Sequence, residues 1–318
     1  MQQQILAPAE WTARAAAHAA RADRLTRDHR ARRSRGEKHP VWDFLFDYYP
    51  VRVSHLRRWH PGLGVLLEPG RDDAPPQASW RDYRVDASGR VAVDTRSLLA
   101  HRGESIAYIR NLLARTTTNP AHFDCFGMHE WAMVYRTNRP RHDLPLRLGK
   151  AGTNAVVASA PELRCTHFDA FRFFTAPARP LNFRVLTRDG QPDNDQCGCL
   201  HATMDLYKWA TKLGPIVEGE LWLDTFELAC RARVLDVEAS PYDCRGLGFG
   251  VVAVETNEGK AEYVSRQREI AAAGRELRAK LLESIRPLFP DEATSAREQG
   301  GKGEVEPHPD PQTGAQDH

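Results

Sequence analysis

Three short stretches in the middle of the chain each place a histidine close to a carboxylate. They are His129-Glu130, His167-x-Asp169 and His201-x3-Asp205. A cysteine precedes each stretch, at Cys125, Cys165 and Cys199. Histidine and carboxylate side chains bind divalent metals and transfer protons near neutral pH. Because the surrounding residues are aromatic and aliphatic, we expect these groups to form a buried site rather than a solvated surface.

One interpretation of the three stretches is a metal site inside a helical bundle. The ligands would be His129, His167 and His201, with Asp205, Asp169 or Glu130 as oxygen ligands or catalytic carboxylates. Mixed nitrogen and oxygen ligation suits one divalent ion of zinc, iron or manganese. His201 and Asp205 are four residues apart and share one face of a helix. Adjacent residues on a helix point about 100° apart, so His129 and Glu130 are not expected to face one ion easily.

An ordinary structural role is the alternative for each of these residues. A single histidine is more often a satisfied core or surface side chain than a ligand, so the metal hypothesis depends on whether the three rings meet. The cysteines are explained as small apolar fillers of a core. A nucleophilic Cys-His pair, at Cys165/His167 or Cys199/His201, is a further alternative.

The composition is that of an ordinary globular protein. The chain has 318 residues, 41% hydrophobic and 27% charged, which is enough for a core without disulfide staples. No apolar run approaches the roughly 18 residues that span a bilayer, so we expect no membrane partner. The first residues lack a basic start followed by an apolar stretch, which predicts a cytoplasmic location rather than secretion. The six cysteines are then expected to be free thiols.

Hydrophobic periodicity predicts a mainly α-helical single domain with long connections and a few short strands. The expected helices cover 10–36, 97–114, 122–135, 199–212, 218–237 and 262–288, with a loop at 137–160 and short strands at 91–93 and 251–255. Residues 1–9 are expected to be a flexible N-terminus and 10–290 the helical domain. Residues 291–318 are polar and rich in Gly, Pro and Glu, so a disordered tail is expected there.

A basic segment near the N-terminus could attract phosphates. Residues 11–60 hold 12 Lys and Arg against 5 Asp and Glu. Arg57 and Arg58 would contact phosphates, and Trp59 or Tyr49 would stack on a base. The simpler interpretation is a solvated helix face for the arginines and core packing for the aromatic rings.

Three segments together resemble one bacterial protein family, found mainly in actinobacteria. The segments read HPVWDFLFDYYPVRVSHLRRWHPG at 39–62, CTHFDAFRFF at 165–174 and CLHATMDLYKW at 199–209. Members of this family are commonly labelled 3-methyladenine DNA glycosylase, and the resemblance covers about residues 10–288. It implies an enzyme, a hydrolase that cleaves the N-glycosidic bond of alkylated bases in DNA. The resemblance brings no assigned catalytic residues with it.

The chain departs from two better-understood glycosylase classes that share this label. The stretch His60-Pro61-Gly62-Leu63-Gly64 imitates the loop of a helix-hairpin-helix motif, with Asp82 near the catalytic position. Pro69-Gly70 and Pro75-Pro76 follow the loop, however, and cannot build its second helix. The zinc-binding class pairs cysteines and histidines near both chain ends, and this chain has no such terminal pairs.

Three functions therefore stand as expectations. A glycosylase needs a carboxylate to oppose the positive charge of the sugar, and Asp205, Asp169 or Glu130 would supply it. It also needs aromatic faces to hold a flipped base. A metal-dependent enzyme acting on a small molecule would use the histidines instead. A non-catalytic helical domain that binds nucleic acid would rely on the basic N-terminal segment.

Overall fold

The computed structural model describes residues 3–49, 51–71 and 74–290. The expected tail, 291–318, lies outside these ranges. Of the described residues, 57% are helical and 6% are in strands, which confirms the prediction of a mainly α-helical domain. Within the described ranges, no helix combines the length and the apolar character that crossing a membrane would require.

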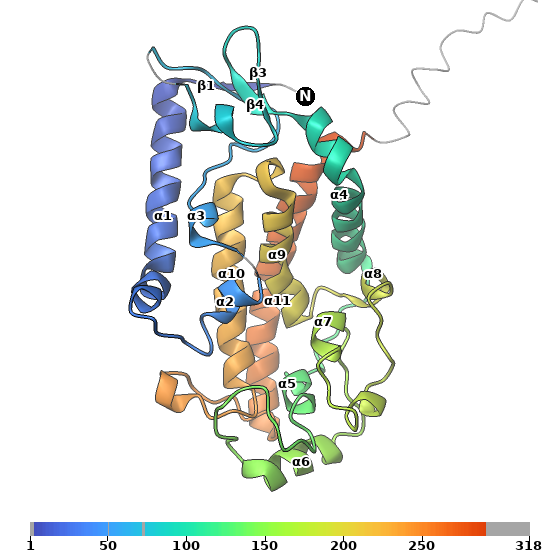
Figure 1. Cartoon of the computed structure of the whole chain (residues 1–318). Coiled ribbons are helices and arrows are strands. Elements are labelled where there is room, and N and C mark those ends of the chain that lie inside the picture. The colour runs from blue at the N-terminus through green and yellow to red at the C-terminus, as the bar shows by residue number, and fades with distance from the viewer. Residues whose placement is uncertain (1–2, 50, 72–73, 291–318) are drawn as a thin grey trace, which may run out of the picture.

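Five long helices form the body of the protein. They are α1 (Pro8–Ser34), α4 (Thr95–Thr118), α9 (Leu200–Leu213), α10 (Gly219–Glu238) and α11 (Asn257–Ile285). Helices α9, α10 and α11 pack on one another at the centre, with α1 and α4 on opposite sides of them (Figure 1). Helix α1 contacts α10, and α4 contacts α11 and α9.

The burial of each long helix follows from its sequence pattern. Helix α1 buries a single stripe that includes Trp11, His18 and Ala22, because one face alone meets the bundle. Helices α9 and α10 are buried on nearly all sides. Helix α4 begins where the Asp94 side chain accepts a hydrogen bond from the Ser97 amide at 3.0 Å. Helix α9 ends at Gly214, whose positive φ favours glycine.

A small sheet covers the end of the bundle where α1 begins (Figure 1). Its strands are β1 (Gln4–Leu6), β2 (Val65–Leu67), β3 (Tyr83–Val85) and β4 (Val91–Val93), in the order β1-β2-β4-β3. Strand β1 pairs with β2 in parallel, and the other pairs are antiparallel. The expectation of a flexible segment at 1–9 is therefore wrong for β1, because Leu6 is fully buried. Strand β2 also stands where a helix-hairpin-helix motif would need its second helix.

Short elements make up the rest of the fold. The α-helices are α2 (Phe44–Asp47), α3 (Val53–Leu56), α5 (Met128–Ala132), α6 (Gly149–Ser159), α7 (Phe168–Phe171) and α8 (Gln191–Asn194). The 3-10 helices are η1 (Pro76–Ser79), η2 (Arg179–Leu181), η3 (Gly214–Ile216), η4 (Arg245–Leu247) and η5 (Arg286–Leu288). Helices α5, α6 and α7 lie at the end of the bundle opposite the sheet (Figure 1).

Three local predictions differ from the structure. The helix expected at 122–135 is reduced to α5, because Phe126 and Gly127 both have positive φ and break the helix before it. The loop expected at 137–160 contains α6. The strand expected at 251–255 is not regular structure in the described chain.

Candidate functional site

The three histidines from the separate sequence stretches meet inside the protein. His129 lies on α5, His167 stands just before α7, and His201 is in the first turn of α9. The ring centroid of His201 is 4.4 Å from that of His129 and 5.6 Å from that of His167. The rings of His129 and His167 are almost fully buried. The three rings therefore lie near one another, but the expectation that all three bind one ion is wrong, because the possible ligand atoms form two groups, with His129 and His201 in one and His167 in the other.

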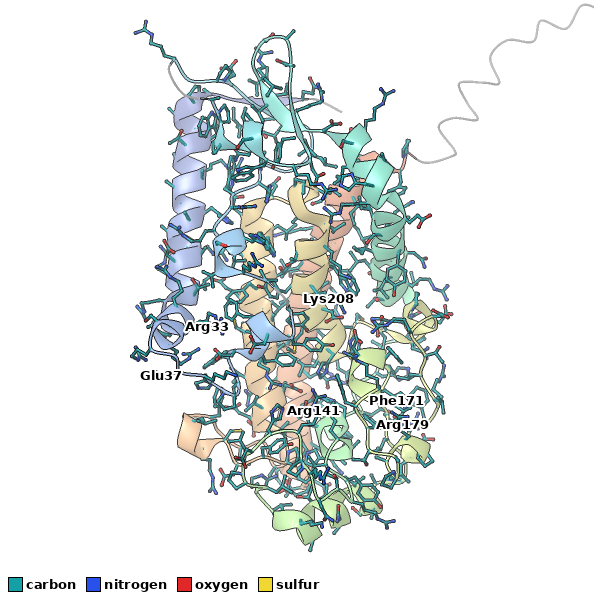
Figure 2. All side chains as sticks on the ribbon, in the orientation of Figure 1. Arg33, Glu37, Arg141, Phe171, Arg179 and Lys208 are labelled. Atoms are coloured by element: carbon teal, nitrogen blue, oxygen red, sulfur yellow. The ribbon has the colours of Figure 1, made fainter. Side chains whose placement is uncertain are left out.

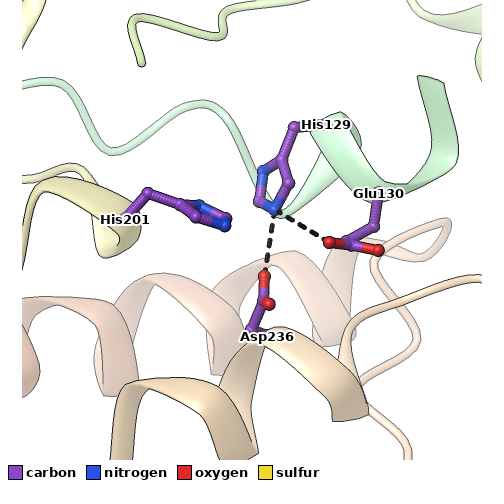
Figure 3. Close-up of side chains that lie close together, drawn as sticks. All are labelled: His129, Glu130, His201 and Asp236. Atoms are coloured by element: carbon purple, nitrogen blue, oxygen red, sulfur yellow. Dashed lines mark hydrogen bonds and ion pairs between the residues drawn. The ribbon is translucent and has the colours of Figure 1, made fainter. Parts of the chain in front are cut away.

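A first cluster surrounds His129 and includes Asp236 from α10 (Figure 3). His129 Nε2 lies 2.9 Å from Asp236 Oδ1 and 3.9 Å from Glu130 Oε1. One possible ligand atom from each of His129, Glu130, His201 and Asp236 lies within 4.8 Å of the others. The expectation that His129 and Glu130 diverge is therefore wrong, since the long Glu130 side chain reaches back to the ring.

Burial and neighbouring charges give the members of this cluster different protonation preferences. Burial alone would lower the pKa of His129, but its hydrogen bond to Asp236 and its contact with Cys125 raise that pKa well above the usual value. Burial and the nearby His129 charge lower the pKa of His201 to about 3, so its ring is neutral at physiological pH. Burial and the charge of Asp236 raise the pKa of Glu130.

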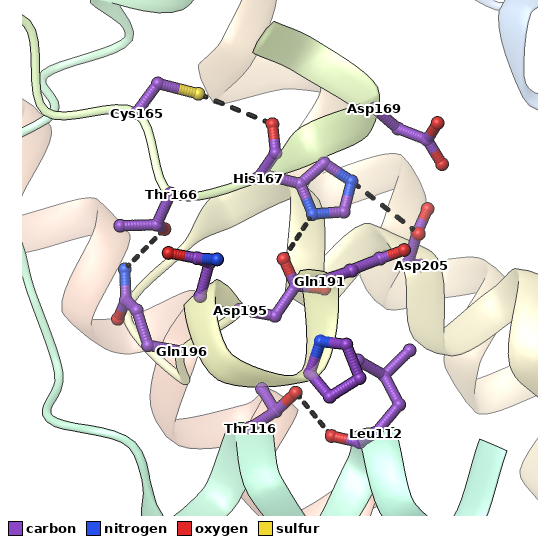
Figure 4. A network of polar contacts seen from close by, with 12 residues as sticks. Leu112, Thr116, Cys165, Thr166, His167, Asp169, Gln191, Asp195, Gln196 and Asp205 are labelled. Atoms are coloured by element: carbon purple, nitrogen blue, oxygen red, sulfur yellow. Dashed lines mark hydrogen bonds and ion pairs between the residues drawn. The ribbon is translucent and has the colours of Figure 1, made fainter. Parts of the chain in front are cut away.

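A second cluster lies around His167 (Figure 4) and, unlike the first, has a lysine between its carboxylates. His167 Nδ1 bonds to Asp195 Oδ1 at 2.9 Å, and its Nε2 is 3.7 Å from Asp205 Oδ2. Lys208 Nζ donates to Asp205 Oδ2 at 2.9 Å and to Asp169 Oδ2 at 3.0 Å. The Lys208 ammonium thus already bridges the two carboxylates that a metal ion would need.

The two carboxylates of the second cluster are satisfied by further partners. The Tyr49 hydroxyl donates to Asp205 Oδ1 at 3.0 Å. The Arg188 guanidinium donates to Asp169 Oδ1 at 2.6 Å. Burial would raise the pKa of Asp169, but Arg188 and Lys208 hold it well below its usual value. Both predicted catalytic aspartates are therefore bound by the Lys208 ammonium at about 3 Å, whereas Glu130 makes only a longer contact, of 3.9 Å, with the His129 ring.

A narrow cleft of about 60 Å³ leads to the first cluster. Its walls include the rings of Phe44, Tyr48 and Phe173, while Glu130 and His201 line it from the side of the cluster. Arg141, labelled in Figure 2, and Arg233 add positive charge to the lining. A volume of this size holds only a few water molecules, so a substrate would need the walls to move apart.

The four residues predicted to contact nucleic acid lie outside both clusters or are buried in the core. The two arginines among them already have partners within the protein. Arg57 pairs with Asp23 at 2.9 Å, and the Arg58 guanidinium lies over the ring of Trp80. Trp59 is 2% exposed and Tyr49 is 1% exposed, so neither ring offers a face to a base. The simpler interpretation of these two rings, core packing, is therefore confirmed.

Two arginines of the basic first helix pair with acids of α10. Arg14 pairs with Glu220 at 3.2 Å, and Arg21 bonds to both Asp224 and Glu227 at 2.7 Å. Part of the positive charge of residues 11–60 is thus paired with carboxylates of α10, and these ion pairs hold α1 against the bundle.

The alternative of a nucleophilic Cys-His pair finds no thiol–imidazole contact between Cys165 and His167 or between Cys199 and His201. Cys165 Sγ contacts the backbone oxygen of His167 at 3.5 Å rather than its ring. Burial raises the pKa of the Cys165 and Cys199 thiols well above the usual value, which disfavours the nucleophilic thiolate. Cys125 Sγ is instead 3.7 Å from Nδ1 of His129, where it fixes the ring from behind.

Four charged residues of the two clusters escaped prediction from the sequence. They are Asp195, Lys208, Arg233 and Asp236. Arg233 donates to Asp236 Oδ2 at 2.5 Å, and both side chains are buried within α10. Arg233 and Asp236 stand three residues apart on α10, but that helix carries five other charged residues, so their spacing alone did not single out Asp236.

Fold and site together define a mainly α-helical protein with a buried histidine–carboxylate centre beside an aromatic cleft. In comparisons with known proteins, the chain matches no family model, no curated protein and no solved structure at a significant level.

Proposed function

We propose that this protein is a metal-dependent hydrolase whose centre consists of His129, His201 and Asp236, with Glu130 as the catalytic base. The observation that carries the proposal is the meeting of these four side chains within 4.8 Å of one another beside the cleft. They come from α5, α9 and α10, which the packing of the bundle holds in place.

The donor set suits a divalent transition metal. Two imidazoles and a carboxylate match the ligand preferences of zinc, iron or manganese. His201 is already neutral, as a ligand must be, and His129 would release its proton when an ion binds. Asp236 has its second oxygen bonded to Arg233, which orients the first oxygen toward the centre.

The first cluster is favoured over the second because its centre holds no lysine. A cation in the second cluster would have to displace the Lys208 ammonium from both Asp169 and Asp205. Burial would lower the pKa of Lys208, but the two aspartates raise it, so the lysine stays charged at neutral pH. The carboxylates of the second cluster are therefore balanced by Lys208 and Arg188, and this cluster needs no metal ion.

Glu130 is placed to move the proton of a hydrolytic water. A bound divalent ion would lower the pKa of a water molecule toward neutrality. Glu130 faces the cleft, and its raised pKa brings it closer to the range in which a carboxylate accepts and returns a proton efficiently. Arg141 and Arg233 would attract an anionic group, and the aromatic walls would hold an apolar or planar portion. The expected substrate is a small molecule with both features.

Metal analysis of the purified protein tests this proposal. We expect about one equivalent of zinc, iron or manganese per chain, lost in His201→Ala. His122→Ala serves as the matched control, because that histidine is exposed and lies outside both clusters. A folded protein that binds none of these ions after incubation with each would contradict the proposal.

A second candidate is excision of alkylated bases from DNA, which the resemblance implies. The specific observation in its favour is a carboxylate, Glu130, in a cleft with aromatic walls, where Phe44 and Tyr48 stack at 4.8 Å. Residues 136–190, which supply Arg141 and Phe173, also hold 10 Lys and Arg against 4 Asp and Glu. This basic segment, rather than residues 11–60, would then contact phosphates.

Sensitivity to chelation separates the two candidates. A glycosylase of this kind should release 3-methyladenine from methylated DNA in the presence of EDTA, and Glu130→Gln should slow release by orders of magnitude. The metal-dependent enzyme should lose activity in EDTA and regain it with added ion. Absence of base release at high protein concentration would remove the glycosylase candidate.

A further inference from the structure

A second pocket lies at the sheet end of the bundle, away from the cleft. It has a volume of about 440 Å³, within the usual range for small-molecule sites. Thr211 and Gly214 line it at one end of α9, whereas His201 stands at the other end of that helix. Ten residues of α-helix separate His201 from Thr211, a distance of about 15 Å. The pocket is therefore distinct from the histidine–carboxylate centre.

The pocket collects arginines from three separate segments. Arg58 follows α3, Arg81 follows Trp80 in the segment before β3, and Arg102 comes from α4. The Arg58 guanidinium lies over the ring of Trp80 at 5.5 Å from its centroid. These segments are distant in the sequence, so the fold itself brings the three guanidinium groups to one cavity.

One carboxylate, that of Asp82, lines the pocket together with these arginines. Asp82 lies 3.8 Å from Arg102 Nη1, 3.9 Å from Arg81 Nε and 3.1 Å from His101 Nε2. Its backbone has a positive φ of 72°, a conformation that aspartate tolerates better than most residues. Three arginines against one aspartate leave an excess of positive charge in the lining.

The histidines of the pocket do not add to this charge. Burial lowers the pKa of His60 to about 3, and nearby His18 and Arg58 contribute. Burial also lowers the pKa of His55, together with the charges of Arg58 and Arg52. Both imidazoles are thus neutral hydrogen-bonding groups at physiological pH.

Gly214 leaves the space that Arg102 needs. A Cβ atom added at Gly214 would lie 3.3 Å from Arg102 Nη1, a tighter contact than most Cβ atoms make. The same glycine has a positive φ of 61°, which other residues rarely adopt. The end of α9 thus provides both the turn and the room for the guanidinium at the pocket wall.

We propose that this pocket binds the phosphate group of a small phosphorylated molecule through Arg58, Arg81 and Arg102. Guanidinium groups pair with phosphate oxygens in two-pronged, charge-assisted hydrogen bonds. The indole rings of Trp80 and Trp222 line the same pocket and would contact a planar or apolar portion of the ligand. A pocket of this size takes a single nucleotide-sized molecule rather than an extended chain.

Calorimetric titration of the full chain in EDTA tests the proposal independently of any metal. The probes are inorganic pyrophosphate, adenosine 5′-monophosphate, adenosine and an oligothymidylate without terminal phosphate. We expect adenosine 5′-monophosphate or pyrophosphate to bind, adenosine to bind far more weakly, and the oligonucleotide to bind no more tightly than the small phosphates. His201→Ala should bind the phosphates as the unaltered chain does.

The arginine variants locate the site. Losing one charge-assisted contact should weaken phosphate binding by about tenfold or more in Arg58→Gln and in Arg102→Gln. Arg84→Gln is the matched control, because Arg84 is exposed on β3 and outside the pocket lining. Arg58 is also exposed, so its replacement should leave the fold intact. Equal losses in all three variants, or tighter binding of the oligonucleotide than of the small phosphates, would overturn the proposal.

Discussion

Asp236 joins two cations through its two carboxylate oxygens. Oδ1 accepts a hydrogen bond from His129 Nε2 at 2.9 Å, and Oδ2 accepts one from Arg233 Nη1 at 2.5 Å. The Asp236 side chain has no exposed surface. Burial would raise its pKa, but the nearby histidines and Arg233 hold that pKa well below the usual value. The bundle thus keeps a charged aspartate in its interior at the point where α5 meets α10.

Asp236→Asn should reduce stability markedly and abolish metal binding. The substitution leaves Arg233 and His129 buried without a balancing charge, and removing one partner of such a pair typically costs about 3–5 kcal/mol. Urea unfolding at neutral pH measures the loss in the free energy of unfolding. The control is Asp224→Asn on the same helix, which should change stability by about 1 kcal/mol or less, because this carboxylate is partly exposed and Arg21 keeps Glu227 as a second partner. Equal effects of the two substitutions would contradict the role of Asp236.

Lys208→Met should destabilise the protein through the second cluster. The ammonium bridges Asp169 and Asp205, and its loss leaves two neighbouring carboxylates facing each other. We expect a decrease in the free energy of unfolding of about 3 kcal/mol or more at neutral pH. The control is Lys212→Met, one turn later on the exposed side of α9, which should change stability by about 0.5 kcal/mol or less. If the Lys208→Met protein were as stable as the unaltered chain, the Lys208 bridge would contribute nothing to the free energy of unfolding.

Asp169 should make the protein sensitive to acid. Its pKa in the folded state is depressed, so its contribution to stability is present above the unfolded value near 4 and is lost as the pH falls further. Asp169→Asn should therefore lower the free energy of unfolding by about 2 kcal/mol at pH 7 and by progressively less below about pH 4. Denaturant titrations at several pH values between 7 and 3 measure both quantities. A difference that stays constant over this range would contradict the assignment.

The positions of the long helices could be predicted from sequence because they depend on local periodicity. The apolar spacing placed α1, α4, α9, α10 and α11 within a few residues of their observed bounds. The short elements were less predictable. Helix α5 is only five residues long, because the positive φ at Phe126 and Gly127 limits it, and such backbone conformations have no clear pattern in the chain.

The sequence alone indicated the helical class of the protein and the three histidine stretches, since both depend on residue types close together in the chain. Only the tertiary structure decided which acid each histidine meets. His129 forms its hydrogen bond with Asp236, 107 residues away, while its sequence neighbour Glu130 makes only the longer contact of 3.9 Å. The structure also placed Lys208 between Asp169 and Asp205, so that its ammonium pairs with both carboxylates that the sequence analysis proposed for catalysis. Charges in a buried site act over a few ångströms of space, and helix packing, not sequence order, sets those distances.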